Sequence, residues 1–194
     1  MRKAFGFAIL AVLISATAWA QEMRHEFTVQ GSGFFPKQTT ESDLRDQPTY
    51  SGGVMAGYRF NINNWLAAEG NYDYFRNEEK FIASSGTTRI PMNVHGATGL
   101  AVVKLPALRR FKPFAVAGGG AMVFDPRNSS GFGRQTRGAF VYGGGADYSI
   151  MTHVSLRAEY RGFVYKIPDF DINNLNMDKV THAAVPSAGL VIRF

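Results

Sequence analysis

Hydrophobic and polar residues alternate one by one along most of residues 21–194. The clearest run is 154–161, Val-Ser-Leu-Arg-Ala-Glu-Tyr-Arg, in which every second side chain is apolar. A period of two indicates β-strands whose two faces meet different surroundings, and no segment has the spacing of an amphipathic helix. Eight such strands are expected at about 25–35, 50–60, 65–75, 90–103, 114–124, 140–148, 154–161 and 182–194.

The connections between these strands alternate in length. Long polar connections are expected at 36–49, 76–89, 125–137 and 165–180, and short ones at 61–64, 104–112 and 150–153. This alternation is typical of strands that run up and down in sequence order, with all the short turns at one end. The pattern therefore predicts an antiparallel sheet with a short-turn end and a long-loop end.

Charge and aromatic content decide which face of the sheet is outside. The more apolar face is rich in Tyr and Phe, whereas the opposite face carries both acids and bases. A soluble barrel of the lipocalin kind would bury the apolar face instead. Strands of about ten residues can cross a membrane at a tilt, and they must close into a ring because hydrocarbon cannot satisfy a free edge. The predicted fold is all-β: an eight-stranded antiparallel up-and-down transmembrane β-barrel.

The large apolar residues of the fourth and fifth strands are assigned to the lipid-facing side by the same reasoning. They are Met92, Val94, Leu100, Val102, Phe114, Val116, Met122 and Phe124. Aromatic rings near the strand ends are expected to form two girdles at the headgroup levels. The short-turn girdle would hold Tyr58, Phe60, Trp65, Phe114, Tyr148 and Phe194, and the long-loop girdle Phe35, Tyr50, Tyr74, Phe124, Phe140 and Tyr165.

Strand parity points nine charged side chains into the barrel. They are Glu26, Arg59, Glu69, Asp73, Asp147, Arg157, Glu159, Arg161 and Arg193. Eight strands enclose an interior just wide enough for side chains to fill. Because an unpaired charge is costly in so confined a space, these acids and bases are expected to pair across strands and plug the lumen.

The first twenty residues are expected to be a cleaved signal peptide. Arg2 and Lys3 precede an apolar run over 4–14, and Ala18 and Ala20 fit the small-residue cleavage site. The run is shorter than the ~20 residues of a spanning helix, which disfavours the alternative of an uncleaved anchor. Residues 21–194 are then a single barrel domain.

Composition removes several classes of function. The chain has no Cys, which excludes zinc fingers, iron–sulfur sites, thiol catalysis and a disulfide framework. The net charge of +6 falls to +4 when Arg2 and Lys3 are removed, and the remaining bases are scattered along the chain. Nucleic-acid binding is therefore not expected. No cofactor or metal is expected either.

The C-terminal segment 187–194, Ser-Ala-Gly-Leu-Val-Ile-Arg-Phe, has a polar residue, a glycine two positions later and hydrophobic third-last and last residues. With 156–161 (Leu-Arg-Ala-Glu-Tyr-Arg) and 112–120 (Lys-Pro-Phe-Ala-Val-Ala-Gly-Gly-Gly), it resembles the small outer-membrane barrels of the OmpA/OmpX type. The resemblance covers residues 21–194 and implies a place in the cell outer membrane, with periplasmic short turns. It also implies contact with membrane lipids and lipopolysaccharide, and an assembly signal at Gly189, Ile192 and Phe194 that the barrel-assembly machinery reads. A monomer is favoured.

Two motifs invite a catalytic or metal-binding reading. His153-Val154-Ser155, with Glu159 nearby, resembles the His/Ser pair of outer-membrane lipid A deacylases. His153 is expected in a short turn and Ser155 in the lumen, away from any lipid substrate, so we expect no catalytic residues. The segment 169–173, Asp-Phe-Asp-Ile-Asn, begins like a calcium loop. Asn174 and Val180 stand where the loop needs Gly and Glu, which favours an ordinary polar loop.

Several functions stay open after this reasoning. Arg127, Arg134 and Arg137 of the third long connection could contact phosphates of outer-leaflet glycolipid, or could simply be solvated. The leading hypothesis is a non-enzymatic integral outer-membrane protein that stabilises the envelope or presents loops for surface interaction. The alternative is a narrow porin-like channel. An outer-membrane lipid-modifying enzyme ranks third, and a soluble ligand carrier ranks fourth.

Overall fold

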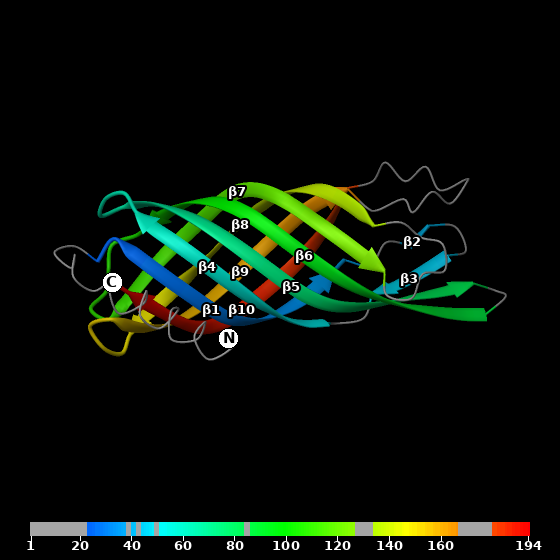
Figure 1. Cartoon of the computed structure of the whole chain (residues 1–194), viewed down its shortest axis with the longest axis horizontal. Helices are drawn as coiled ribbons and strands as arrows, with labels where there is room; N and C mark the ends of the chain where they lie inside the picture. The colour runs from blue at the N-terminus through cyan, green and yellow to red at the C-terminus, as the bar shows by residue number, and fades with distance from the viewer. Residues whose placement is uncertain are drawn as a thin grey trace, which may run out of the picture.

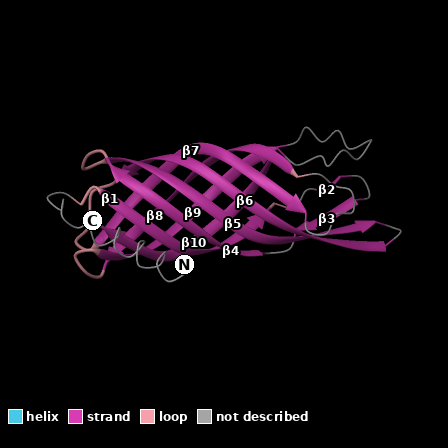
Figure 2. Cartoon of the chain, viewed as in Figure 1, coloured by secondary structure: helices cyan, strands magenta, loops and turns pink. Residues whose placement is uncertain are grey.

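The computed structural model describes residues 23–37, 40–41, 44–48, 51–83, 86–126, 134–166 and 180–194. Within these residues eight long strands close into one antiparallel barrel, which confirms the predicted fold class (Figures 1 and 2). They are β1 (His25–Pro36), β4 (Ser51–Asn61), β5 (Leu66–Ala83), β6 (Gly86–Lys104), β7 (Phe111–Pro126), β8 (Gln135–Ser149), β9 (Val154–Lys166) and β10 (Val180–Arg193). Two short strands, β2 (Thr40–Glu41) and β3 (Leu44–Pro48), lie between β1 and β4 in the sequence. The expected signal peptide, residues 1–20, lies outside the described residues.

The barrel strands follow one another around the ring in sequence order. The order is β5, β4, β1, β10, β9, β8, β7 and β6, and pairing of β5 with β6 closes the ring. β1 and β10 form a seam between distant parts of the chain, with Glu26 opposite Arg193. No helix in the described part of the chain is long and apolar enough to cross a membrane.

The two ends of the barrel differ as the connection lengths predict. Residues 62–65, 105–110 and 150–153 make the short connections at one end, where β1 also begins and β10 also finishes (Figure 1). This is the short-turn end, and the opposite end is the long-loop end. The positions of the three short turns agree with the expected ones to within about two residues.

The prediction of a polar loop at 76–89 is wrong. β5 continues to Ala83 and β6 begins at Gly86, so the two strands form a hairpin that runs past the barrel rim (Figure 1). Beyond the last β4–β5 pair, Gly53 with Phe75, the outer part of β5 pairs with β3 through residues 79–82. Strands outside the membrane need no apolar face, which is why the alternation of hydrophobic residues stops before the strands do.

On most strands the apolar side chains face outward, as predicted. Phe27, Tyr58, Phe140, Leu156 and Leu190 are all between 43% and 55% exposed on the outer surface. On β9 the alternate residues, Ser155 to Arg161, are buried in the lumen. The outer surface of the barrel is therefore apolar and the interior holds the charges.

The assignment of faces on β6 and β7 is wrong. The large residues Val94, Leu100, Val102, Phe114, Val116, Met122 and Phe124 are buried in the lumen. The outward positions of these strands hold Ala97, Gly99, Ala101, Ala115, Ala117 and Gly119 instead. Both faces of these strands are apolar, so hydrophobicity alone cannot tell them apart, whereas a closed interior needs the larger volumes. Phe114, Phe124 and Tyr165 are consequently lumen residues and not girdle residues, and Tyr50 lies outside the described residues.

Candidate functional site

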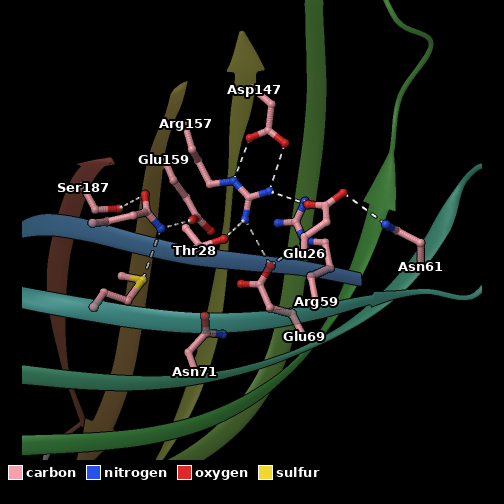
Figure 3. A network of polar contacts seen from close by, with 12 residues as sticks. Glu26, Thr28, Arg59, Asn61, Glu69, Asn71, Asp147, Arg157, Glu159 and Ser187 are labelled. Carbon is pink, nitrogen blue, oxygen red and sulfur yellow. Dashed lines mark hydrogen bonds and ion pairs between the residues drawn. The ribbon is translucent and has the colours of Figure 1, made fainter. Parts of the chain in front are cut away.

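All nine charged residues predicted to point inward are buried, with at most 7% of any of them exposed. They come from six of the eight barrel strands: β1, β4, β5, β8, β9 and β10. Figure 3 shows most of this cluster, with side chains from several strands converging on one another. We refer to Glu26, Arg59, Glu69, Asp147, Arg157, Glu159, Arg161 and Arg193 as the lumen network.

Arg157 is the most connected base of the lumen network. Its Nε and Nη2 donate to the two oxygens of Asp147 at 2.7 and 2.9 Å, in a bidentate pair. The same Nη2 lies 3.0 Å from Glu26 Oε2, and Nη1 lies 3.4 Å from Glu69 Oε2. The Thr28 hydroxyl accepts a further bond at 3.3 Å. A guanidinium suits this position because its planar fork can serve several carboxylates at once.

Glu69 joins three arginines from two different strands. Its Oε2 accepts from Arg59 Nε at 2.5 Å, and its Oε1 accepts from Arg161 Nη2 at 2.7 Å. With the longer contact to Arg157, the carboxylate lies among charges supplied by β4 and β9. Arg161 also binds both oxygens of Glu159, at 2.7 and 3.0 Å. The charges of Glu69, Glu159 and Arg161 are thereby compensated, as burial in a confined interior requires.

Arg193 ties the barrel seam into the lumen network. Its Nε donates to Glu26 Oε1 at 3.1 Å, and its Nη2 lies 2.6 Å from Asp147 Oδ2. Its Nη1 donates to the Ser155 hydroxyl. Ion pairs therefore link β10 to β1 and to β8, in addition to the backbone hydrogen bonds that β10 makes with β1 and β9.

An aromatic ring covers one side of the lumen network. The guanidinium carbons of Arg59 and Arg157 lie 4.3 and 4.8 Å from the centroid of the Phe114 ring. Arginine stacks favourably on the face of an aromatic ring, and the gain is larger when water is excluded. The expectation that Phe114 faces lipid missed this contact because both faces of β7 are apolar, so hydrophobicity does not show which face is inside.

Asp73 is buried with the other acids but forms no ion pair with the arginines of the lumen network in the described part of the chain. Among the described residues, neither of its carboxylate oxygens has a hydrogen-bond partner, and no ion pair includes it. The remaining eight charges comprise four acids and four arginines, so the lumen network is balanced without Asp73. Parity correctly placed Asp73 inside, but the expectation that it would pair is wrong.

An apolar layer fills the lumen between the network and the long-loop end. On β9 the buried run Ser155 to Arg161 is followed by Phe163, and on β5 the buried run Glu69 to Asp73 is followed by Phe75. The layer comprises Phe34, Met55, Phe75, Val94, Met122, Val141, Phe163 and Val185, each at most 1% exposed. Phe34 and Phe75 contact each other with ring centroids 4.9 Å apart. Hydrophobic alternation did not predict this layer, although Phe34, Phe75 and Phe163 share the parity of the inward charges on their strands.

The structure separates the residues of the deacylase-like motif. His153 is exposed in the turn between β8 and β9, whereas Ser155 is fully buried and bound to Arg193. Glu159 is engaged by Arg161 and by Gln30, whose Nε2 lies 3.3 Å from Oε2. These three side chains do not form a nucleophile and base within reach of one another. Within the part of the chain that the structure describes, no group of three or more His, Asp or Glu side chains could hold a metal ion.

The remaining predicted residues lie at the surface, at the seam or outside the described ranges. Ile192 faces outward on β10, and Phe194 exchanges backbone hydrogen bonds of 2.9 and 3.1 Å with His25. Arg134 is exposed just before β8, and Arg137 donates to Gln135 at 3.2 Å. Arg127 and the segment 169–173 lie outside the described residues.

Comparison with known proteins places this geometry in context. The chain matches the family model described as outer membrane protein beta-barrel domain over residues 6–194. Its structure is similar to that of OprG from Pseudomonas aeruginosa, with 11% sequence identity, a TM-score of 0.67 and coverage of 88% of this chain and 95% of that chain. Neisserial surface protein A is similar with 15% identity, a TM-score of 0.65 and coverage of 88% and 97%.

A third similar structure is Ail of Yersinia pestis, with 13% identity, a TM-score of 0.55 and coverage of 88% of this chain and 97% of that chain. Among curated proteins, no sequence matches the chain. At such low identities the likeness to the three structures shows a shared fold and nothing more.

Proposed function

Because the chain belongs to the outer membrane protein beta-barrel domain family, we propose that it is a non-enzymatic membrane anchor with a plugged lumen. Its function would then reside on its outer surfaces, in an envelope-structural or surface-interaction role. The observation that carries this proposal is the presence of two successive closures inside the barrel. The lumen network fills the interior toward the short-turn end, and the apolar layer fills it toward the long-loop end.

The two closures would oppose ion passage in different ways. An ion entering from the short-turn end meets arginines and carboxylates that already neutralise one another at 2.5–3.8 Å. An ion entering from the long-loop end meets buried Phe34, Phe75 and Phe163, which offer no ligand to replace its hydration shell. An eight-stranded barrel has little room for a third route, since its interior is about the size that side chains fill.

The hairpin of β5 and β6 supports a role in surface interaction. By the orientation usual for outer-membrane barrels, the long-loop end is extracellular. The hairpin projects beyond the rim there, and β3 and β2 extend it sideways into a small sheet (Figure 1). Paired strands would present a more defined surface to a partner than unstructured loops of the same length would.

The other parts of the proposal concern delivery and surroundings. Residues 1–20 would direct export, and the barrel-assembly machinery would read Gly189, Ile192 and Phe194. Outer-membrane lipids and lipopolysaccharide would surround the barrel, with Arg127, Arg134 and Arg137 as candidate phosphate contacts. The separation of His153 from Ser155 supports the absence of a catalytic role.

Planar-bilayer recording on the purified, refolded protein tests the proposal. We expect no stable single-channel conductance from the wild-type chain. Variant F75A/F163A, which removes two rings of the apolar layer, serves as a comparison for how much of the closure depends on that layer. Long-lived conductance steps from the wild-type chain would overturn the proposal in favour of the narrow porin-like channel.

A further inference from the structure

A polar cluster interrupts the apolar outer surface of β5 and β6. The Tyr72 hydroxyl lies 2.7 Å from His95 Nδ1, and the Tyr74 hydroxyl donates to Asn93 Oδ1 at 3.2 Å. Arg76 Nε donates to the same Tyr74 oxygen at 3.3 Å, and the Tyr74 and His95 rings lie 5.1 Å apart. These five residues are the outer-face cluster.

The outer-face cluster retains donors for an additional ligand. The Nε bond to Tyr74 leaves both terminal amino groups of Arg76 without a partner among the described residues, and the side chain is fully exposed. When Tyr72 donates its proton to His95 Nδ1, the imidazole carries its own proton on Nε2 and can donate it to an anion. A guanidinium and an imidazole side by side are suited to a phosphate.

The height of the outer-face cluster places it at the outer headgroups. Trp65 lies at the short-turn end, and Arg76 follows it by eleven residues on β5. At about 3.3 Å per residue and a tilt of about 40°, these residues rise about 28 Å, close to the ~25 Å height of the apolar band. Arg76 therefore lies where a lipid of the extracellular leaflet carries its headgroup.

An apolar groove leads from the outer-face cluster along the wall of the barrel. It has a volume of about 560 Å³, and its lining includes Phe27, Ala56, Tyr58, Gly70, Tyr72 and Ala97. Tyr72 belongs to both the groove and the cluster. A second groove of about 530 Å³ shares Tyr58 and Gly70 with the first and continues past Ala68 and Ala101 toward the short-turn end. Small residues and aromatic rings line these open grooves, along which an acyl chain can lie.

We infer that the outer face of β4, β5 and β6 binds a phosphorylated glycolipid of the extracellular leaflet, of the lipid A class. A phosphate contacts Arg76 and His95, and an acyl chain lies in the groove between Tyr58 and Tyr72. The charge of Arg76 selects an anionic headgroup, and its height selects the extracellular leaflet, where lipopolysaccharide is the anionic lipid. This inference rests on the location of the barrel in the outer membrane and adds a defined lipid site to it.

The test is retention of added lipid by the purified protein in detergent, measured by native mass spectrometry. The probes are lipid A, dephosphorylated lipid A and phosphatidylglycerol. Variant R76Q removes the charge, and variant G70L fills the groove at a position where an added Cβ meets no atom within 4 Å. The matched controls are R110Q, at an exposed arginine of the short-turn end, and G138L, at another glycine with open space around its Cβ. A band shift on unheated gels verifies that each variant is folded.

We expect wild-type protein and both controls to retain lipid A. R76Q should retain it about tenfold less, since a hydrogen bond to a charged group is worth that much. G70L should also retain less lipid A, because leucine occupies the groove. Dephosphorylated lipid A should bind the wild type about as weakly as lipid A binds R76Q. Equal retention by all folded variants would overturn the inference while leaving the plugged barrel untouched. Equal retention of phosphatidylglycerol would overturn the choice of glycolipid.

Discussion

Arg161 Nη2 lies 2.7 Å from Glu69 Oε1, although the two residues stand on opposite walls of the barrel. Arg161 is on β9 and Glu69 is on β5, four strands away in either direction around the ring. The ion pair therefore spans the whole lumen. It braces the ring from inside, where the backbone hydrogen bonds connect only neighbouring strands.

Loss of the Glu69 carboxylate should destabilise the barrel strongly. In variant E69A three buried guanidinium groups, those of Arg59, Arg157 and Arg161, lose a shared acceptor. We expect a loss of about 3–5 kcal/mol in the free energy of unfolding. Variant E159A should lose less, because among the described residues Glu159 forms an ion pair with one arginine, Arg161. Urea titration in lipid vesicles, followed by the fluorescence of Trp65, measures both, and an E69A protein as stable as wild type would contradict the bracing role.

Loss of the Asp73 charge, in contrast, should not destabilise the barrel. Variant D73N removes a buried charge that has no partner among the described residues and leaves the four acids and four arginines balanced. We expect stability to stay the same or to rise by up to about 2 kcal/mol, because an unpaired buried charge is costly. The matched variant D147N should lower stability, since Asp147 holds Arg157 and Arg193. The same urea titration applies, and a D73N loss equal to that of D147N would refute the assignment.

Replacement of Gly189 by any other residue, even alanine, should destabilise the barrel. A Cβ built at this position would overlap the carbonyl oxygen of Val29 and the Cα of Gln30, both on β1 across the seam. Backbone cannot give way as a flexible side chain can, so we expect G189A to lose about 2–3 kcal/mol or more. Variant G70A meets no atom within 4 Å and should be tolerated. The refolding yield and the unfolding midpoint of the two variants are compared in the same lipid. A G189A protein as stable as G70A would contradict the prediction.

Phe194 should matter for the yield of folded barrel in cells. The residue completes the seam through its backbone bonds to His25, and its ring stacks on the His25 ring at a centroid distance of 5.8 Å. Deletion of Phe194, or F194S, should lower the amount of heat-modifiable protein in the membrane fraction. Variant H25A removes the stacking partner and leaves the C-terminal residues intact. If H25A reduces the yield as much as F194S does, the effect belongs to packing and not to recognition by the assembly machinery.

The inward positions of the charged residues follow directly from the sequence. A charged side chain that faces hydrocarbon is very costly in free energy. Residues such as Arg157 and Glu69 must therefore point into the lumen, and so must the other residues of the same parity on their strands. The pairing partners do not follow, because a long guanidinium inside a ring can reach several strands. Asp73 shows the limit: its parity matches that of Glu69, yet its surroundings differ.

The faces of β6 and β7 show where hydrophobic alternation stops being informative. Phe114 and Ala115 are both apolar, and only the volume needed inside the ring decides that the phenylalanine points inward. The sequence pattern did not predict the projecting hairpin of β5 and β6 for a related reason. Residues 76–80, Arg-Asn-Glu-Glu-Lys, are all polar, and their strand conformation depends on pairing with β3 and β6, which no local pattern reveals.

Because the seam joins the first and last strands of the barrel, the ring can close only after β10 has been delivered. Arg193 and Glu26 are separated by 167 positions in the chain, so the contact that completes the ring needs the last strand to be delivered. Until then β1 and β9 each keep an unpaired edge, which is a template for aggregation. Pairing across so long a separation is slow, so the chain must be kept from collapsing while it waits. We expect that a chain that stops before β10 leaves the edges of β1 and β9 unpaired and does not close into a smaller barrel.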